Sequence, residues 1–176
     1  MPATTPTLGL PYPVLSDPPN VPADIQALAN ALDTLVNGVT TVGVPASASV
    51  SMGNSAWTTL CSVNVTLPAT QVVEIVAWAR IVNSGATRPI TALQVLDGST
   101  LLFGTGQVDV PGTGDNPGFN PVDVYINTPR RAISLTAGAH TLNLQAWKDS
   151  NGTLDAKQLS TFGTSTINVT GIEVMY

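Results

Sequence analysis

The stretch of sequence that decides the fold is Val72-Val73-Glu74-Ile75-Val76-Ala77-Trp78-Ala79-Arg80-Ile81-Val82. Every second residue from Val73 to Ile81 is apolar, which is the period of a β-strand with one buried face. The other face reads Val72, Glu74, Val76, Trp78, Arg80 and Val82. This second face is too apolar for open water and too polar for a core, so we expect a subunit interface there, with Val76 and Trp78 in it.

The flanking sequence continues the same period of two. One phase of the preceding segment holds Trp57, Thr59, Cys61, Val63, Val65 and Leu67. We expect that phase to face inward, with Trp57 in the core and Cys61 as a small buried thiol. Further on, Leu142, Leu144 and Ala146 alternate with Asn143 and Gln145. The last strand is expected from about Thr164 to Tyr176, with a β-bulge at Thr170-Gly171, where the apolar phase slips.

Turn residues separate these segments. Asp97-Gly98 and Asn151-Gly152 are strong signals for β-hairpins, and the Gly- and Pro-rich stretch 104–129 predicts one long loop. Many short strands without a helix between them predict an all-β, antiparallel, jelly-roll-like sandwich. We assign residues 46–176 to that domain.

The N-terminal part follows different rules. Residues 1–21 are rich in proline, which disfavours both helix and ladder strand, so we expect an extended arm that anchors the chain through Leu8, Leu10, Tyr12 and Leu15. A short helix is expected over residues 22–38, because Ile25, Leu28, Leu32 and Leu35 repeat with coiled-coil spacing. Two heptads do not make a stable isolated helix. The stripe must therefore pack on the β domain or on equivalent helices of sister subunits.

Composition narrows the function. Charged residues make up 10% of the 176, against about 25% in an ordinary soluble domain. The net charge of −5 argues against nucleic acid as a partner. No apolar run has the length of a membrane span, and the N-terminus lacks the pattern of a signal peptide. We therefore expect assembly in a bacterial cytoplasm and no contact with a membrane.

A search for reactive constellations favours no catalytic site, metal site or cofactor. The single histidine, His140, is expected to make a local hydrogen bond at the start of a strand. Residues 149–155 resemble a calcium loop, but a hairpin turn explains them better. A ligand loop remains as a candidate, made of Asp109, Asp115 and Asp123 with Trp147. Exposed Trp78 and Trp147 either stack on sugars or anchor a protein interface, and we favour the interface.

Two motifs carry a resemblance. Thr7-Leu8-Gly9-Leu10-Pro11-Tyr12-Pro13, followed by Asp17-Pro18-Pro19-Asn20-Val21-Pro22-Ala23-Asp24-Ile25-Gln26-Ala27-Leu28-Ala29, resembles the N-terminal segment of virion proteins from tailed phages of actinobacteria. Leu135 to Leu144 is similar to the "LxxGxHxxxL" strand start of phage fibre-tip and C1q/TNF-like jelly rolls.

The resemblance implies a non-enzymatic structural virion protein, in a tail fibre, another minor tail component or the capsid decoration. Its partners would be other virion proteins and two further copies of itself in a homotrimer. The alternative is a module that binds host-surface glycans. A polysaccharide-degrading enzyme is a third and weaker hypothesis.

Overall fold

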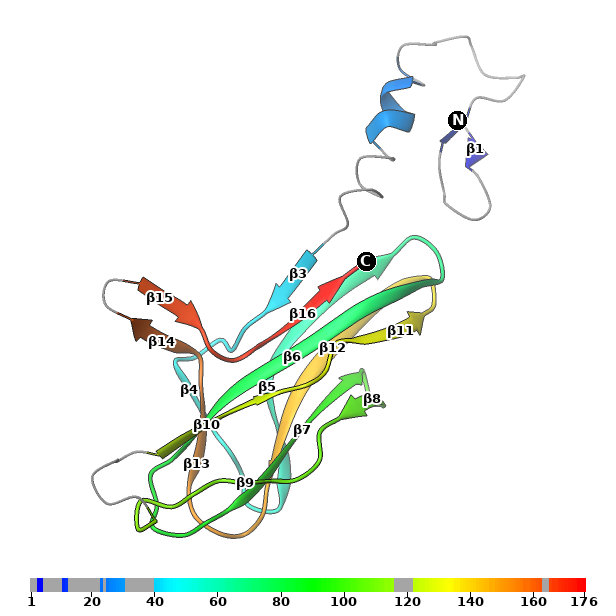
Figure 1. Cartoon of the computed structure of the whole chain (residues 1–176). Helices are drawn as coiled ribbons and strands as arrows, with labels where there is room; N and C mark the ends of the chain where they lie inside the picture. Colours follow the sequence, from blue (N-terminus) through cyan, green and yellow to red (C-terminus); the bar gives the residue numbers. More distant parts are fainter. Residues whose placement is uncertain are drawn as a thin grey trace.

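The computed structural model of the chain describes residues 3–4, 11–12, 23, 25–30, 40–115, 122–162 and 165–176. From Thr40 onward, two antiparallel sheets pack face to face (Figure 1). The chain crosses from one sheet to the other after β4, β5, β6, β9, β11 and β12. This architecture confirms the predicted all-β, jelly-roll-like sandwich.

The larger sheet is built around β6, the longest strand. Its strands are β3 (Thr40–Gly43), β4 (Ser49–Ser51), β6 (Gln71–Asn83), β10 (Val122–Asn127), β11 (Arg131–Leu135), β13 (Leu154–Lys157) and β16 (Gly171–Met175). Trp78 pairs with Gly171 of β16 and with Asn127 of β10, so these two strands lie on opposite edges of β6. By the same registers, β16 and β13 pair with successive stretches of one edge of β6, and β11 and β10 pair with successive stretches of the other edge.

Two buried threonines complete the hydrogen bonding along the two edges of β6. Thr128 lies between β10 and β11; its backbone N–H donates to the Ala77 carbonyl at 2.8 Å, and its Oγ1 accepts from the Ala77 N–H at 2.9 Å. Thr170 lies between β13 and β16; its Oγ1 donates to the Lys157 carbonyl at 2.6 Å and accepts from the Arg80 N–H at 3.2 Å. The ladder of β6 is therefore completed by side chains where one neighbouring strand ends and the next begins.

The second sheet has β12 at its centre. Its strands are β5 (Ala56–Leu67), β7 (Ile90–Asp97), β8 (Thr100–Gly104), β9 (Val108–Asp109) and β12 (Gly138–Lys148). The predicted hairpin at Asp97-Gly98 is confirmed, because β7 and β8 are joined by a tight turn in which Gly98 has φ +57°. Asp97 itself pairs with Thr100, so the turn residues are Gly98 and Ser99.

A bulge in β5 overturns one prediction. Leu144 of β12 pairs with Cys61 and Gln145 pairs with Thr59, so Leu60 is an extra residue in β5. Leu60 and Cys61 are both buried, and the phase of the strand reverses before them. Trp57 therefore faces outward, with 44% of its surface exposed, and the prediction that it belongs to the core is wrong.

The core lies between the sheets, as the period of two predicts. The fully buried or nearly fully buried side chains of the central strands are Val73, Ile75, Ala77, Ala79 and Ile81 of β6 and Leu142, Leu144 and Ala146 of β12. The predicted burial of these residues and of Cys61 is confirmed. Burial also raises the pKa of the Cys61 thiol to about 12.

Two connections differ from their predictions. Gly152 has φ +63°, as a turn requires, but β13 pairs with β4 and β6 rather than β12. Asn151-Gly152 is therefore a crossover between the sheets and not a hairpin. The predicted last strand is two strands: β15 (Ser165–Asn168) pairs with β14 (Leu159–Phe162), and β16 joins the larger sheet. The slip at Thr170-Gly171 marks this change of partner and not a bulge.

The sandwich also begins earlier than residue 46, because β3 pairs with β16 along the larger sheet. Within the predicted arm, β1 (Ala3–Thr4) pairs with β2 (Pro11–Tyr12), so this part of the arm does form a short ladder. Residue 23 and residues 25–30 are helical, within the predicted helix. Leu8, Leu10, Leu15, Leu32 and Leu35 lie outside the described residues.

The predicted loop over residues 104–129 is only partly a loop. It contains β9 and the whole of β10. The prediction failed because Gly and Pro cluster on both sides of β10 and hide the short alternating run from Val122 to Asn127.

Candidate functional site

The outer face of the β12 sheet forms a regular array of uncharged polar side chains. The same outward phase also includes Ala92 and Leu96 of β7, and Leu101 of β8, 59% exposed, pairs with Leu96. We call the polar and tryptophan part the β12 face; its residues are Trp57, Thr59, Ser62 and Asn64 of β5, Gln94 of β7, and Thr141, Asn143, Gln145 and Trp147 of β12. Each is exposed or half-buried, and each alternates with a buried neighbour across the strand, except next to the bulge. The pairing register places them in rows across the sheet.

Hydrogen bonds link the strands within each row of the β12 face. Gln94 Nε2 donates to Gln145 Oε1 at 2.8 Å, and Gln145 Nε2 donates to Thr59 Oγ1 at 3.1 Å. In the next rows, Ser62 Oγ donates to Asn143 Oδ1 at 2.6 Å and Thr141 Oγ1 donates to Asn64 Oδ1 at 2.8 Å. These bonds hold the amides in fixed orientations while leaving capacity for further donors and acceptors.

Two tryptophans lie at one end of this array. Trp57 and Trp147 are direct cross-strand partners on β5 and β12. Trp147 is half-buried, and Trp57 is largely open to solvent. Sequence reasoning identified Trp147 but missed Trp57, because the bulge at Leu60 has no signature in the alternation of β5. It also missed the polar rows, although their signal is visible in the uncharged phase Ser62, Asn64, Asn143 and Gln145.

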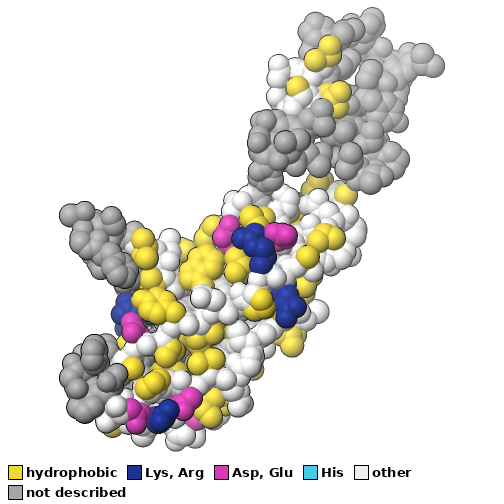
Figure 2. Space-filling model, viewed as in Figure 1, with side chains coloured by type: hydrophobic (Ala, Val, Ile, Leu, Met, Phe, Trp, Pro, Cys, Tyr) yellow, Lys and Arg dark blue, Asp and Glu magenta, His cyan; other side chains and the backbone are white. Residues whose placement is uncertain are grey.

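The outer face of the larger sheet is different in kind. We call it the β6 face; its residues include Val72, Glu74, Val76, Trp78 and Arg80 of β6, Asp123 and Tyr125 of β10, Val42 of β3, and Glu173 of β16. Figure 2 shows hydrophobic side chains gathered on this face between a few charged groups. Val72 is 64% exposed and Tyr125 is 55% exposed. Apolar side chains that gather in an exposed patch are typical of an interaction surface.

Trp78 lies against the backbone of β16. A Cβ on Gly171 would come within 2.9 Å of the Trp78 ring and within 3.0 Å of the Gly43 carbonyl oxygen. The glycine therefore allows the indole to lie flat on the sheet, half-buried, with its other side outward. The structure brings Val76 and Trp78 onto one face, where the sequence places them.

Two ion pairs within the chain lie on the β6 face. Arg80 Nε lies 2.6 Å from Asp123 Oδ2, and the guanidinium also lies 5.9 Å from the Tyr125 ring centroid. Arg130 contacts Glu74 at 3.0 Å, near the end of the sheet. Such pairing lowers the cost of covering the face with another protein surface.

The helix that precedes the sandwich presents apolar side chains to solvent. Ile25 is 61% exposed, and Leu28 lies on the same stripe. The structure thus leaves the described part of the stripe exposed and not packed on the sandwich.

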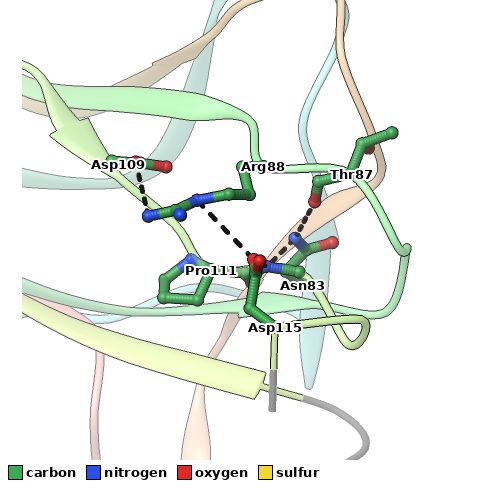
Figure 3. A network of polar contacts seen from close by, with 7 residues as sticks. Asn83, Thr87, Arg88, Asp109, Pro111 and Asp115 are labelled. Atoms are coloured by element: carbon green, nitrogen blue, oxygen red, sulfur yellow. Dashed lines mark hydrogen bonds and ion pairs between the residues drawn. The ribbon is translucent and has the colours of Figure 1, made fainter. Parts of the chain in front are cut away.

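The candidate ligand loop resolves into a closed corner at one end of the sandwich. Figure 3 shows Arg88 between two of the predicted carboxylates: it lies 2.9 Å from Asp109 and 3.6 Å from Asp115. Asn83, fully buried, donates to the carbonyls of Thr87 and Pro111 at 2.8 and 3.0 Å. The acids therefore act as internal partners of the corner.

The other two residues of the candidate loop lie elsewhere. Asp123 pairs with Arg80 on the β6 face, and Trp147 lies on the β12 face. The structure brings Asp109 and Asp115 together, but it does not bring Asp123 or Trp147 to the same place. Among the described residues, no three of His, Cys, Asp and Glu gather as metal ligands would. No described helix has the length and apolar character that a transmembrane span requires.

The remaining titratable groups are held by structural contacts. His140 makes the predicted local hydrogen bond, since its Nε2 lies 2.9 Å from the Thr136 carbonyl oxygen, and its Nδ1 lies 2.7 Å from Asp97 Oδ2. The Thr136 carbonyl and then the Asp97 carboxylate raise the pKa of His140. The buried Lys148 ammonium contacts Asn54 Oδ1 and donates to three backbone carbonyls, of Asp149, Asn151 and Gly152.

Comparison with known proteins gives similarity of fold alone. No protein-family model matches the chain, and no curated protein matches it. Among solved structures, dimeric latent PorU from Porphyromonas gingivalis has 12% identity and a TM-score of 0.46; the alignment covers 78% of this chain and 12% of PorU. Eiger TNF from S. frugiperda has 12% identity and a TM-score of 0.41, covering 78% and 91%.

A carbohydrate-binding domain is similar at the same level. The C-terminal CBM6 of LamC from Zobellia galactanivorans has 14% identity and a TM-score of 0.35, covering 78% of this chain and all of that one. Of PorU, the first structure named above, this chain spans only about an eighth of the length. The class that the fold and its surfaces define is a β-sandwich module with binding or structural surfaces.

Proposed function

We propose that this chain is a non-enzymatic structural protein of a tailed-phage virion, attached by its N-terminal arm and displaying the β-sandwich as a homotrimer. The observation that carries the proposal is the β6 face, which exposes Val72, Tyr125 and Val42 while Arg80 pairs with Asp123 and Arg130 pairs with Glu74 within the chain. Only 10% of the residues are charged, so a monomer would have few charged side chains to keep a protein with such a face in solution.

Exposed apolar residues outside β6 also support assembly. The exposed helix stripe precedes β3, and β3 carries the exposed Val42 at the margin of the β6 sheet. Closed symmetric homo-oligomers are the usual way in which such surfaces are covered. The trimer and the phage particle come from the resemblance of residues 7–29, which implies an anchor of this kind.

The non-enzymatic part of the proposal is supported by the state of the reactive groups. Cys61 is buried with a raised pKa, which keeps the thiol protonated and inert. Both ring nitrogens of His140 are engaged, by Thr136 and Asp97. The burial of Cys61 and the engagement of His140 Nε2 by the Thr136 carbonyl support structural roles for both residues.

The test is the native mass of the full-length protein and two matched variants. We expect the unaltered protein to have three times the mass of one chain. Val72→Asp should dissociate it, because the carboxylate would be buried without a partner at the interface. Leu101→Asp is the control: Leu101 is 59% exposed but belongs to β8 of the other sheet, so this variant should remain a trimer.

A monomeric unaltered protein, or equal behaviour of the two variants, contradicts the proposal. A third variant, Ile25→Asp, and a truncated chain starting at Thr40 assign the contribution of the helix. The truncation begins at Thr40 because β3 is part of the sheet and must be retained. A trimer that survives truncation places the interface in the sandwich, whereas dissociation places it in the helix.

A further inference from the structure

We propose that the β12 face is a binding surface for an uncharged polysaccharide. The inference goes beyond the assembly role and does not depend on it, because the β12 face belongs to the other sheet. It also replaces the candidate loop as the location of a ligand, since Asp109 and Asp115 of that loop pair with Arg88 and Asp123 pairs with Arg80.

The charge distribution selects the class of ligand. The strands of the β12 sheet contain four residues whose side chains are charged or can become charged: Asp97, Asp109, His140 and Lys148. Asp97 pairs with His140, Asp109 pairs with Arg88, and Lys148 is buried. The outward rows of β5, β7 and β12 carry none. A polyanion requires lysine or arginine, so nucleic acids and acidic polymers do not fit this face.

The polar groups of the face suit a ligand rich in hydroxyls. Gln94, Gln145, Asn143 and Asn64 present amides, which both donate and accept hydrogen bonds, and Thr59, Ser62 and Thr141 present hydroxyls with the same capacity. Sugar hydroxyls need such dual partners. Successive rows are two residues apart along the strands, about 7 Å, so an extended chain of sugars meets a new row at regular intervals.

The tryptophan pair supplies the apolar part of the site. Pyranose rings have a face of C–H groups, and an indole ring offers a flat, polarisable surface against which that face packs. Trp57 is 44% exposed and pairs with the half-buried Trp147 in one row. The next row along the strands contains Thr59 and Gln145. A rigid ring next to pre-oriented amides is the arrangement that lowers the ordering cost of binding.

A purely structural ladder is the main rival interpretation. It explains the hydrogen bonds within the rows, but it does not need an exposed tryptophan, and it does not need the face to exclude charge. A second copy of the chain as the occupant is the other rival. Such a copy is favoured more by the β6 face, which exposes Val72, Tyr125 and Val42, than by the β12 sheet, whose exposed large apolar residues are Trp57 and Leu101.

The experiment is affinity electrophoresis of the full-length protein in gels that contain one soluble polysaccharide each. The neutral probes are dextran, galactomannan, laminarin and hydroxyethyl cellulose, and polygalacturonate is the anionic probe. We expect retardation by at least one neutral probe, unchanged by about 0.5 M NaCl, which screens ionic contacts. Retardation by none of the neutral probes, or by polygalacturonate alone, overturns the proposal.

Variants then locate the site, with the affinity measured for a short oligosaccharide of the probe that binds, so that multivalency does not contribute. Trp57→Ala should weaken binding at least tenfold. Asn143→Ala provides a second position, in case the first variant alters folding. Tyr125→Ala is the matched control, because it removes an aromatic side chain of similar exposure from the β6 face; its affinity should be unchanged.

Equal affinity of Trp57→Ala and the unaltered protein, or equal loss in Tyr125→Ala, contradicts the assignment. A change in native mass caused by Trp57→Ala also contradicts it, because that result identifies the β12 face as a contact between copies. The trimer itself is tested by Val72→Asp, so the failure of one proposal is distinguishable from the failure of the other.

Discussion

The β6 face and the β12 face cover the same core, yet they satisfy their polar groups in different ways. On the β6 face, carboxylates and guanidinium groups pair across strands, as in Arg80 with Asp123, and aromatic and aliphatic residues lie between them. On the β12 face, amides and hydroxyls bond in rows, as in Gln94–Gln145–Thr59. Both faces belong to antiparallel sheets of similar strands, so the difference resides in the outward phase alone.

This difference shows how one sandwich is able to hold two functions. The inward phase determines the fold and leaves the outward phase of each sheet free to vary. Internally paired charges with apolar neighbours suit a surface that another protein covers. Fixed amides without charge suit a surface that meets a neutral, hydroxyl-rich ligand.

The largest expected effect tests whether the two sheets share one core. Ile75→Ala on β6 and Leu144→Ala on β12 both remove side chains with no exposed surface. Each should lower the free energy of unfolding by about 2–5 kcal/mol through lost transfer energy and a residual cavity. Chemical denaturation should show one cooperative transition for both variants. Two separate transitions, one affected by each change, contradict a shared core.

A smaller effect is expected at the threonines beside β6. Thr128→Val and Thr170→Val keep the side-chain volume but remove hydroxyls that bond the backbone at Ala77 and at Lys157 and Arg80. Each should cost about 1–3 kcal/mol, since buried backbone groups lose their partners. Ser62→Ala on the β12 face is the control, because water replaces the lost partner; its effect should stay within about 0.5 kcal/mol. Similar losses at all three positions contradict the contrast between the sheets.

The smallest effect concerns His140, at the end of the β12 sheet. Its pKa is raised in the folded protein by the Thr136 carbonyl and by Asp97. The folded state therefore holds the proton more tightly than the unfolded state does, and the extra stability is present below the unfolded pKa of about 6.5. It is lost as the pH rises through the raised folded value.

Urea midpoints near pH 6 should accordingly exceed those near pH 8.5, and His140→Gln should remove this difference. A midpoint that rises with pH over this interval, or an unchanged dependence in the variant, contradicts the assignment of the effect to His140.

The sequence predicts the fold because apolar, inward-facing residues recur at every second position of the central strands. Val73 to Ile81 and Leu142 to Ala146 specify both central strands, and their burial is as expected. The bulge at Leu60 was not predictable, because its cause is the pairing of β5 with β12, which is a contact across more than 80 positions of sequence. The same holds for Asn151-Gly152, where local turn chemistry specifies the turn but not the sheet that the chain enters next.

The β6 face was predictable in part, since Val76 and Trp78 stand in one phase of one strand. The β12 face was not, because its rows join residues of three strands whose order only the structure provides. The predicted anchoring residues and the C-terminal half of the helix stripe remain predictions.

The most direct test of the two-face account uses the three tryptophans of the unaltered protein, one on the β6 face and two on the β12 face. Oxidative footprinting with mass spectrometry would measure the reactivity of Trp78, Trp57 and Trp147 in the assembled protein, with and without a bound neutral polysaccharide. The account predicts that Trp78 is protected in the free assembly, and that Trp57 reacts readily until the polysaccharide is added. A reactive Trp78 together with a Trp57 that is already protected without polysaccharide would contradict it.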